Sequence, residues 1–89
     1  GGEEFVGVFA INREYEATIV AERIRHLVEN TVITNAEGKE LKVTISVGIT
    51  TSRPQDTLET MLKRADSLMY QSKRNGRNKV TTDISAEDI

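Results

Sequence analysis

Residues 1–11 have the sequence GGEEFVGVFAI, in which two glycines and two carboxylates run directly into an apolar stretch. Residues 5–11 are apolar at almost every position, which predicts a strand buried on both faces. Glycine lets a backbone approach a phosphate or a nucleobase closely, and a neighbouring carboxylate can hold a divalent cation. Five residues are a weak signal by themselves, because Gly-Gly before a strand is also typical of a plain hairpin turn.

The sequence after this strand predicts a helix and two further strands. Asn12 can cap a helix over residues 13–30, because apolar side chains recur there at helical spacing. Residues 31–34 form a short β-branched run, and residues 35–39 have the composition of a turn. Residues 41–50 are rich in Val, Ile and Thr and predict a single strand.

A second helix and a last strand complete the predicted fold. The pattern Asp56-x-x-Glu59 has the form of a capping box, and the helix that it starts extends to about Asn75. Gly76 is suited to end this helix in a left-handed conformation. Residues 78–82 form a last short strand. The order β-α-β-β-α-β predicts an α+β fold, a two-layer sandwich in which two helices pack against one sheet.

The spacing of the apolar residues also predicts which side chains are buried. In the first helix the buried positions are Ala17, Val20, Ala21, Ile24, Leu27 and Val28. In the second helix they are Leu58, Met61, Leu62, Ala65, Leu68, Met69 and Ser72. The lone histidine, His26, falls on the polar face of the first helix, where a surface role is expected.

Size and composition restrict the class of protein. A chain of 89 residues holds one domain or less, and 14 acidic against 12 basic residues argue against a general binder of nucleic acid or anionic membranes. The absence of cysteine fits a reducing cytoplasm. Apolar runs are too short for a transmembrane helix or a signal peptide. A start on Gly-Gly instead of Met leads us to expect an excised part of a longer protein.

A basic cluster, Lys73-Arg74-Asn75-Gly76-Arg77-Asn78, follows at the end of the second predicted helix. Lys73 and Arg77 are four residues apart and can therefore reach the same side. They could simply complement the helix dipole, which is typically worth about 0.3–1 kcal/mol. They could also bind a phosphate, since Arg grips oxygens with a fork and Lys supplies a compact charge.

Taken together, the glycine-rich start and the basic cluster resemble the two ends of the GGDEF family, the bacterial diguanylate cyclases. Three segments between them resemble the family as well: AERIR at residues 21–25, VTISVGI at 43–49 and RADSLMY at 64–70. The resemblance extends from Gly1 to about Val80. It implies the C-terminal portion of a GGDEF domain over residues 1–82, part of a nucleotide-cyclase-like fold that lacks its N-terminal half, with residues 83–89 a tail that frays.

The resemblance implies a role for individual residues. Gly1 and Gly2 would form the hairpin tip against the guanine nucleotide. Glu3 would bind Mg²⁺ or Mn²⁺ and help activate the ribose 3′-hydroxyl, while Lys73 and Arg77 would hold the triphosphate of GTP. Two domains would meet as a homodimer and condense two GTP into cyclic dimeric GMP, with release of pyrophosphate. Asn78 is expected to bond backbone near the turn.

Two other functions remain open at this point. The chain could belong to a non-catalytic GGDEF-type module that binds a nucleotide or a protein, or to an unrelated ferredoxin-like interaction domain. In the family the first-strand Asp and the guanine-reading residues precede the position of Gly1. We therefore expect the isolated 89 residues to be inactive, and to self-associate through the apolar strand at residues 5–11.

Overall fold

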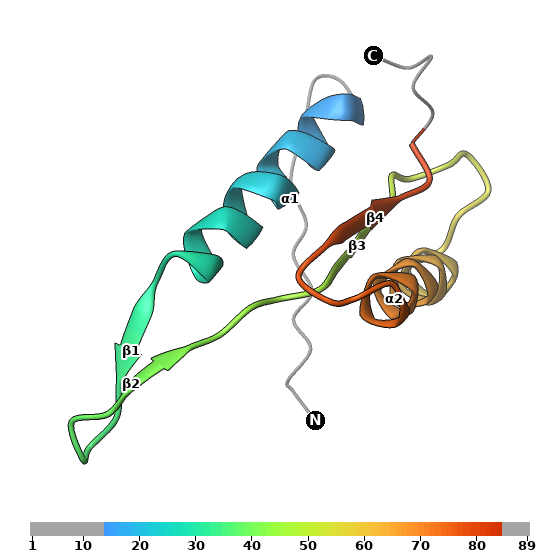
Figure 1. The fold of residues 1–89 in the computed structure, drawn as a ribbon. Helices are drawn as coiled ribbons and strands as arrows, with labels where there is room; N and C mark the ends of the chain where they lie inside the picture. The colour runs from blue at the N-terminus through green and yellow to red at the C-terminus, as the bar shows by residue number, and fades with distance from the viewer. Residues whose placement is uncertain (1–13, 85–89) are drawn as a thin grey trace.

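The computed structural model describes residues 14–84, and the expected strand at residues 5–11 and the cap Asn12 lie outside this range. Figure 1 shows the order of the described elements. They are α1 (Glu14–Glu29), β1 (Val32–Thr34), β2 (Glu40–Lys42), β3 (Val47–Ile49), α2 (Leu58–Arg74) and β4 (Val80–Thr82). The predicted mixture of helices and short strands is confirmed, and no described helix is long and apolar enough to cross a membrane.

The centre of the described structure is a β-α-β unit. Strands β3 and β4 pair in parallel, with Val47 opposite Val80 and Ile49 opposite Thr82. Parallel neighbours need a long crossover connection, and α2 provides it. Helix α1 also packs on both strands. In the view of Figure 1, α1 lies to the left of the strand pair and α2 to the right.

A glycine and a serine bring β3 into close contact with α2. A Cβ atom added to Gly48 would collide with the backbone of α2, at the nitrogen of Met69 and the carbonyl oxygen of Ala65. Ser72 is fully buried, and its hydroxyl lies 2.8 Å from the carbonyl oxygen of Val47 and 2.6 Å from the hydroxyl of Thr81. The helix is therefore fixed to both strands of the pair.

The predicted helical stripes are buried only in part. Ala21 and Leu68 are buried, as predicted. The prediction was wrong for four residues that are exposed, namely Ile24, Leu27, Leu58 and Leu62. Helical periodicity identifies an apolar face but not the length of helix that a partner covers. The C-terminal part of α1 runs beyond β3 and β4 towards the hairpin, which leaves its last turns uncovered by that strand pair (Figure 1).

Strands β1 and β2 form a separate antiparallel hairpin, with Ile33 opposite Leu41. The predicted turn at residues 35–39 is confirmed, and the side-chain oxygen of Asn35 accepts hydrogen bonds from the backbone of Glu37 and Lys39 at 2.9 Å each. The single strand predicted over residues 41–50 is wrong. Its first part pairs within the hairpin and its second part pairs with β4, so residues 43–46 cross between two sheets without strand pairing.

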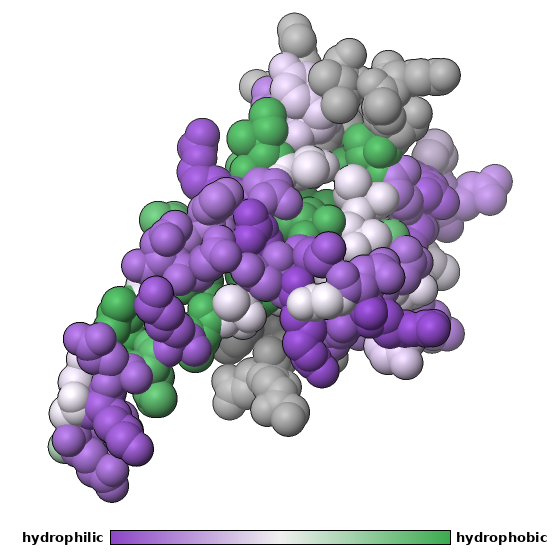
Figure 2. Space-filling model, in the orientation of Figure 1, coloured by the Kyte–Doolittle hydropathy of each residue, from purple (hydrophilic) through white to green (hydrophobic). Residues whose placement is uncertain are grey.

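The hairpin carries apolar side chains on its surface. Figure 1 shows it extending away from the β3–β4 pair, and Figure 2 shows green apolar atoms near its base and purple atoms at its tip. The exposed apolar residues around it are Leu27, Val32, Ile33, Leu41 and Val43. Both strands are exposed along their whole length, so the hairpin adds little to the core.

Helix α2 begins one residue later than the capping box predicted. Its cap is Thr57, and the reciprocal hydrogen bonds of the box join Thr57 to Thr60, where Asp56 and Glu59 were expected. The carboxylate of Asp56 is occupied elsewhere, because it accepts hydrogen bonds from the side chain of Arg64 and the backbone nitrogen of Arg53. Thr57 therefore caps the helix.

Candidate functional site

The predicted phosphate-binding residues lie where α2 ends. Asn75 caps the helix, and the backbone nitrogen of Arg77 donates to the carbonyl oxygen of Ser72 at 2.9 Å. This six-residue loop belongs to the Schellman type of helix end, with glycine in its usual position. Gly76 has φ of +115°, so the left-handed stop predicted from the sequence is confirmed.

The left-handed backbone continues past the glycine. Arg77 has φ of 63° and Asn78 has φ of 49°, so three successive residues lie in this region. Asparagine tolerates the conformation, whereas for a residue such as Arg it costs roughly 1–2 kcal/mol. Backbone of this kind persists where surrounding contacts fix it, and it is frequent at functional sites.

Lys73 and Arg77 meet the first requirement for a phosphate site, which is free positive charge. Lys73 is half-buried in the last turn of α2 and Arg77 is exposed. Neither side chain forms a hydrogen bond or an ion pair with another residue between Glu14 and Ile84. Two other basic residues lie nearby: Arg74, whose guanidinium is 5.9 Å from the centre of the Tyr70 ring, and the exposed Lys79.

The position at a C-terminus has a consequence for anion binding. A helix carries partial negative charge at this end, so the backbone repels a phosphate and attracts cations. An anion held here depends on the side-chain charges alone. This differs from sites at helix N-termini, where backbone N–H groups bind the phosphate.

The side chain of Asn78 connects this turn to α1. Its oxygen accepts a hydrogen bond from Arg25 Nη1 at 3.0 Å, and its nitrogen donates to Glu29 Oε1 at 2.8 Å. Arg25 Nη1 also lies 3.3 Å from Glu29 Oε2, so the three side chains form a closed ring. The prediction that Asn78 bonds backbone was wrong, because its amide faces two charged groups of α1. The hydrogen bond from Asn78 is the largest of the influences that lower the pKa of Glu29, and Arg25 adds to it.

Sequence reasoning missed Arg25 and Glu29 as part of this site. Both lie on the polar side of α1, where an i,i+4 pair of opposite charge is normally a surface feature. The Arg25 side chain is only 14% exposed, so most of it is covered. Their contact with Asn78 spans about fifty residues of sequence, and no local pattern indicates it.

The other predicted site residues, Gly1, Gly2 and Glu3, lie outside the described residues. Within residues 14–84, no three His, Cys, Asp or Glu side chains are gathered closely enough to hold a metal ion. His26 is 63% exposed, in agreement with its predicted surface position.

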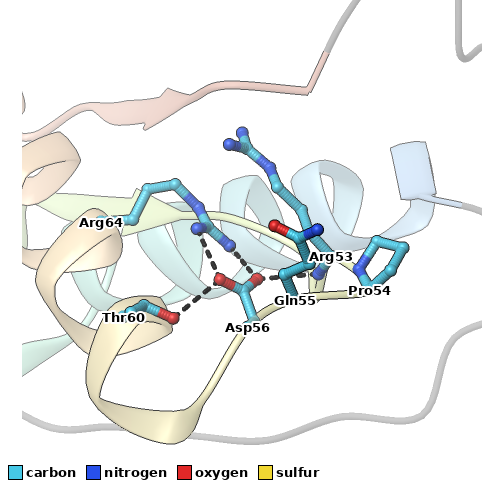
Figure 3. A pocket seen from close by; sticks show the side chains of 6 residues that line it. All are labelled: Arg53, Pro54, Gln55, Asp56, Thr60 and Arg64. Atoms are coloured by element: carbon cyan, nitrogen blue, oxygen red, sulfur yellow. Dashed lines mark hydrogen bonds and ion pairs between the residues drawn. The ribbon is translucent and has the colours of Figure 1, made fainter.

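An open hollow of about 430 Å³ lies at the other end of α2. Its lining residues are Arg53, Pro54, Gln55, Asp56, Thr60 and Arg64. Figure 3 shows Arg64 and Thr60 pointing towards the Asp56 carboxylate, while the Arg53 side chain extends away from it. Lys73 follows Arg64, the last lining residue on α2, by nine residues, so about 13 Å of helix separates this hollow from the predicted phosphate-binding residues.

The charges of this hollow are paired with one another. Arg64 forms ion pairs with Asp56 and Asp83, and Arg53 lies 2.7 Å from Asp83. Thr50 donates to Asp83 at 2.9 Å. Asp83 is the first residue of the tail that was expected to fray, and these contacts connect it to the loop before α2. We interpret this cluster as a structural contact that holds the loop before α2, α2 itself and Asp83 together. Lys73 and Arg77 therefore remain the candidate ligand-binding charges.

Comparisons with known proteins identify the family. The family model described as "Diguanylate cyclase, GGDEF domain" matches residues 1–79. The response regulator PleD of Caulobacter vibrioides is 48% identical over 82 residues, which are 90% of this chain and 18% of PleD. Diguanylate cyclase DgcZ of Escherichia coli is 37% identical over 79 residues, which are 89% of this chain and 26% of DgcZ.

Solved structures give the same result. The GGDEF domain of DgcB from Caulobacter crescentus, in complex with c-di-GMP, superposes with a TM-score of 0.69 at 33% identity. This match covers 80% of the chain and 41% of the DgcB domain. Diguanylate cyclase SiaD of Pseudomonas aeruginosa, in complex with its activator SiaC, gives a TM-score of 0.73 at 34% identity, covering 80% of this chain and 27% of SiaD. An unrelated ferredoxin-like interaction domain is therefore excluded, and the chain belongs to the GGDEF family as a portion of a GGDEF domain.

Proposed function

We propose that the domain to which this chain belongs condenses two molecules of GTP into cyclic dimeric GMP and releases two pyrophosphates. In each half-reaction a ribose 3′-hydroxyl attacks the α-phosphate of the other GTP, and the bond from that phosphorus to pyrophosphate breaks. The observation that carries the proposal is the family match over residues 1–79, together with Lys73 and Arg77 at the end of α2. Since GTP is a cytoplasmic nucleotide, we place the reaction in the cytoplasm.

Lys73 and Arg77 bind the triphosphate in this proposal. Arg77 is exposed and can offer its guanidinium fork to two phosphate oxygens, while Lys73 adds a point charge from the last helical turn. Both charges oppose the negative end of the α2 dipole, which would otherwise disfavour the ligand. The exposed position of Arg77 is compatible with release of pyrophosphate, because the product can leave directly into the solvent.

Glu3 is the proposed metal ligand, and Gly1 with Gly2 the segment against the nucleotide. A divalent cation, Mg²⁺ or Mn²⁺, would lower the pKa of the attacking hydroxyl and neutralise charge on the phosphate under attack. Mg²⁺ typically takes one or two carboxylates plus substrate phosphates. Glu3 would supply one such carboxylate, and the phosphates of GTP would supply further oxygen ligands.

A homodimer follows from the symmetry of the product. Cyclic dimeric GMP contains two identical halves, and two domains that face each other across a two-fold axis would supply two identical half-sites. Each domain would hold one GTP with its own Lys73 and Arg77. The reaction then depends on protein concentration in the range where the dimer dissociates.

The test is conversion of GTP by a full-length protein that carries this chain, with Glu3→Gln as the critical variant. Magnesium-dependent formation of cyclic dimeric GMP is expected, and Glu3→Gln should abolish it because an amide lacks the anionic oxygen that holds the cation. Glu59→Gln is the matched control, since the Glu59 side chain is 78% exposed on α2. Binding of GTP without turnover would favour a non-catalytic GGDEF module, and full activity of Glu3→Gln would reject the role of Glu3.

A further inference from the structure

The ring formed by Arg25, Glu29 and Asn78 has a function beyond stability if the turn that it holds carries a ligand-binding residue. Asn78 directly follows Arg77 in the chain. The backbone of Arg77 is thus fixed on both sides. Its N–H donates to the carbonyl oxygen of Ser72, and the side chain of the following residue, Asn78, is hydrogen-bonded to α1.

We propose that Asn78, held by Arg25 and Glu29, is a positioning residue that sets the direction in which Arg77 meets the triphosphate of GTP. This proposal rests on the proposed function, because it assumes that Arg77 binds phosphate. Arg77 and Asn78 both have a positive φ, a conformation that a free loop of these residues would rarely keep. The hydrogen bonds of Asn78 to two charged groups keep it there.

The contacts of the ring are selective, which supplies a control. Glu29 uses one oxygen for Asn78 and the other for Arg25, and Arg25 Nη1 is shared between Asn78 and Glu29. Glu22 pairs with Arg25 through Nη2 at 3.0 Å and makes no hydrogen bond or ion pair with Asn78 in the described structure. His26 lies 3.7 Å from Glu29 on its exposed side. Removing Glu29 takes away one of the two hydrogen bonds of Asn78 and one partner of Arg25, whereas removing Glu22 leaves both hydrogen bonds of Asn78 intact.

The experiment compares binding of two probes to the full-length protein that carries this chain. One probe is the α,β-methylene analogue of GTP, which keeps three phosphorus groups but cannot be attacked with loss of pyrophosphate. The other is GMP, which lacks the β- and γ-phosphates. Asn78→Ala and Glu29→Ala should weaken binding of the triphosphate analogue about tenfold, or about 1.4 kcal/mol, with GMP changed less than about twofold. Glu22→Ala should bind like the wild type, and Glu29→Gln, which keeps the acceptor oxygen for Asn78 but loses the one that faces Arg25, should weaken binding less than Glu29→Ala does.

A double-mutant cycle separates positioning from general damage. In an Arg77→Ala background, Asn78→Ala should weaken binding of the triphosphate analogue by less than about a further twofold, because the residue that Asn78 positions is gone. Three results would each overturn the proposal. The variants could lose affinity equally for the triphosphate analogue and for GMP, or Glu29→Ala and Asn78→Ala could both bind like the wild type. Asn78→Ala could also keep its full effect on affinity in the Arg77→Ala background. If Asn78→Ala does not fold, Glu29→Ala on α1 provides the same comparison. Wild-type binding by Arg77→Ala would instead reject the phosphate role itself, which distinguishes the two failures.

Discussion

The guanidinium of Arg64 grips the carboxylate of Asp56 at two points, with 2.9 Å from Nη1 to Oδ1 and 2.5 Å from Nη2 to Oδ2 (Figure 3). Only 7% of the Asp56 side chain is exposed. The same carboxylate accepts hydrogen bonds from the backbone of Arg53 and from the Thr60 hydroxyl. Hydrogen bonding to Arg64, with smaller help from these two donors, holds the pKa of Asp56 far below its ordinary value.

This arrangement predicts acid sensitivity. The pKa of an unfolded Asp is about 4, and the folded value is lower, so the stabilisation is present above about pH 4 and is lost as the pH falls towards the folded pKa. Asp56→Asn should therefore be less stable than the wild type at about pH 7, and the difference should shrink at about pH 3. Thermal unfolding across this range is the measurement. Glu59→Gln, with an exposed carboxylate, should behave like the wild type at both pH values.

Gly48→Ala should destabilise the domain strongly. The added methyl would meet the α2 backbone at Ala65 and Met69, which cannot move without shifting the helix. Overpacking of this kind typically costs about 1–3 kcal/mol. Chemical denaturation measures the loss. The control is Gly38→Asn in the hairpin loop, where nothing lies within 4 Å and asparagine tolerates the positive φ. Equal effects of the two substitutions would contradict the close approach of β3 to α2.

Lys73→Ala and Arg77→Ala should each weaken GTP binding and leave the fold intact. A charge-assisted hydrogen bond to phosphate is worth about 1.5–3 kcal/mol, or roughly tenfold to a hundredfold in affinity. Loss of a cation from a helix end costs less than about 1 kcal/mol of stability. Calorimetric titration with GTP, beside a thermal melt of each variant, compares the two effects. Unchanged affinity with reduced stability would show that these residues only complement the helix dipole.

The 89-residue chain on its own should neither turn over GTP nor remain a monomer at micromolar concentration. The match covers 41% of the solved DgcB chain, so a large part of such a domain has no counterpart in these 89 residues. Apolar side chains such as Leu27 and Leu58, each 65% exposed, favour association. Analytical ultracentrifugation and a GTP assay test the two parts separately. A folded monomer would contradict the expected association, and product formation would contradict the expected inactivity.

The sequence by itself determined the type and order of most elements and the family. Local signals were sufficient for these, because helical spacing in α1 and α2, the turn at Asn35 and the stop at Gly76 each depend on neighbours in the chain. The motifs at residues 1–5 and 73–78 are sufficient to indicate the GGDEF family, and the family match over residues 1–79 agrees.

Only the tertiary structure decided which partner each segment meets. Residues 41–50 are rich in strand-forming residues throughout, but the two parts of this segment pair in different sheets. The first part pairs with β1 and the second with β4, and these two partner strands belong to separate sheets. The capping role passed from Asp56 to Thr57 because Arg64, eight residues away, occupies the carboxylate. Asn78 meets Arg25 and Glu29 across about fifty residues. A sequence pattern records the chemistry of each side chain, but the contacts that use it depend on how distant elements pack.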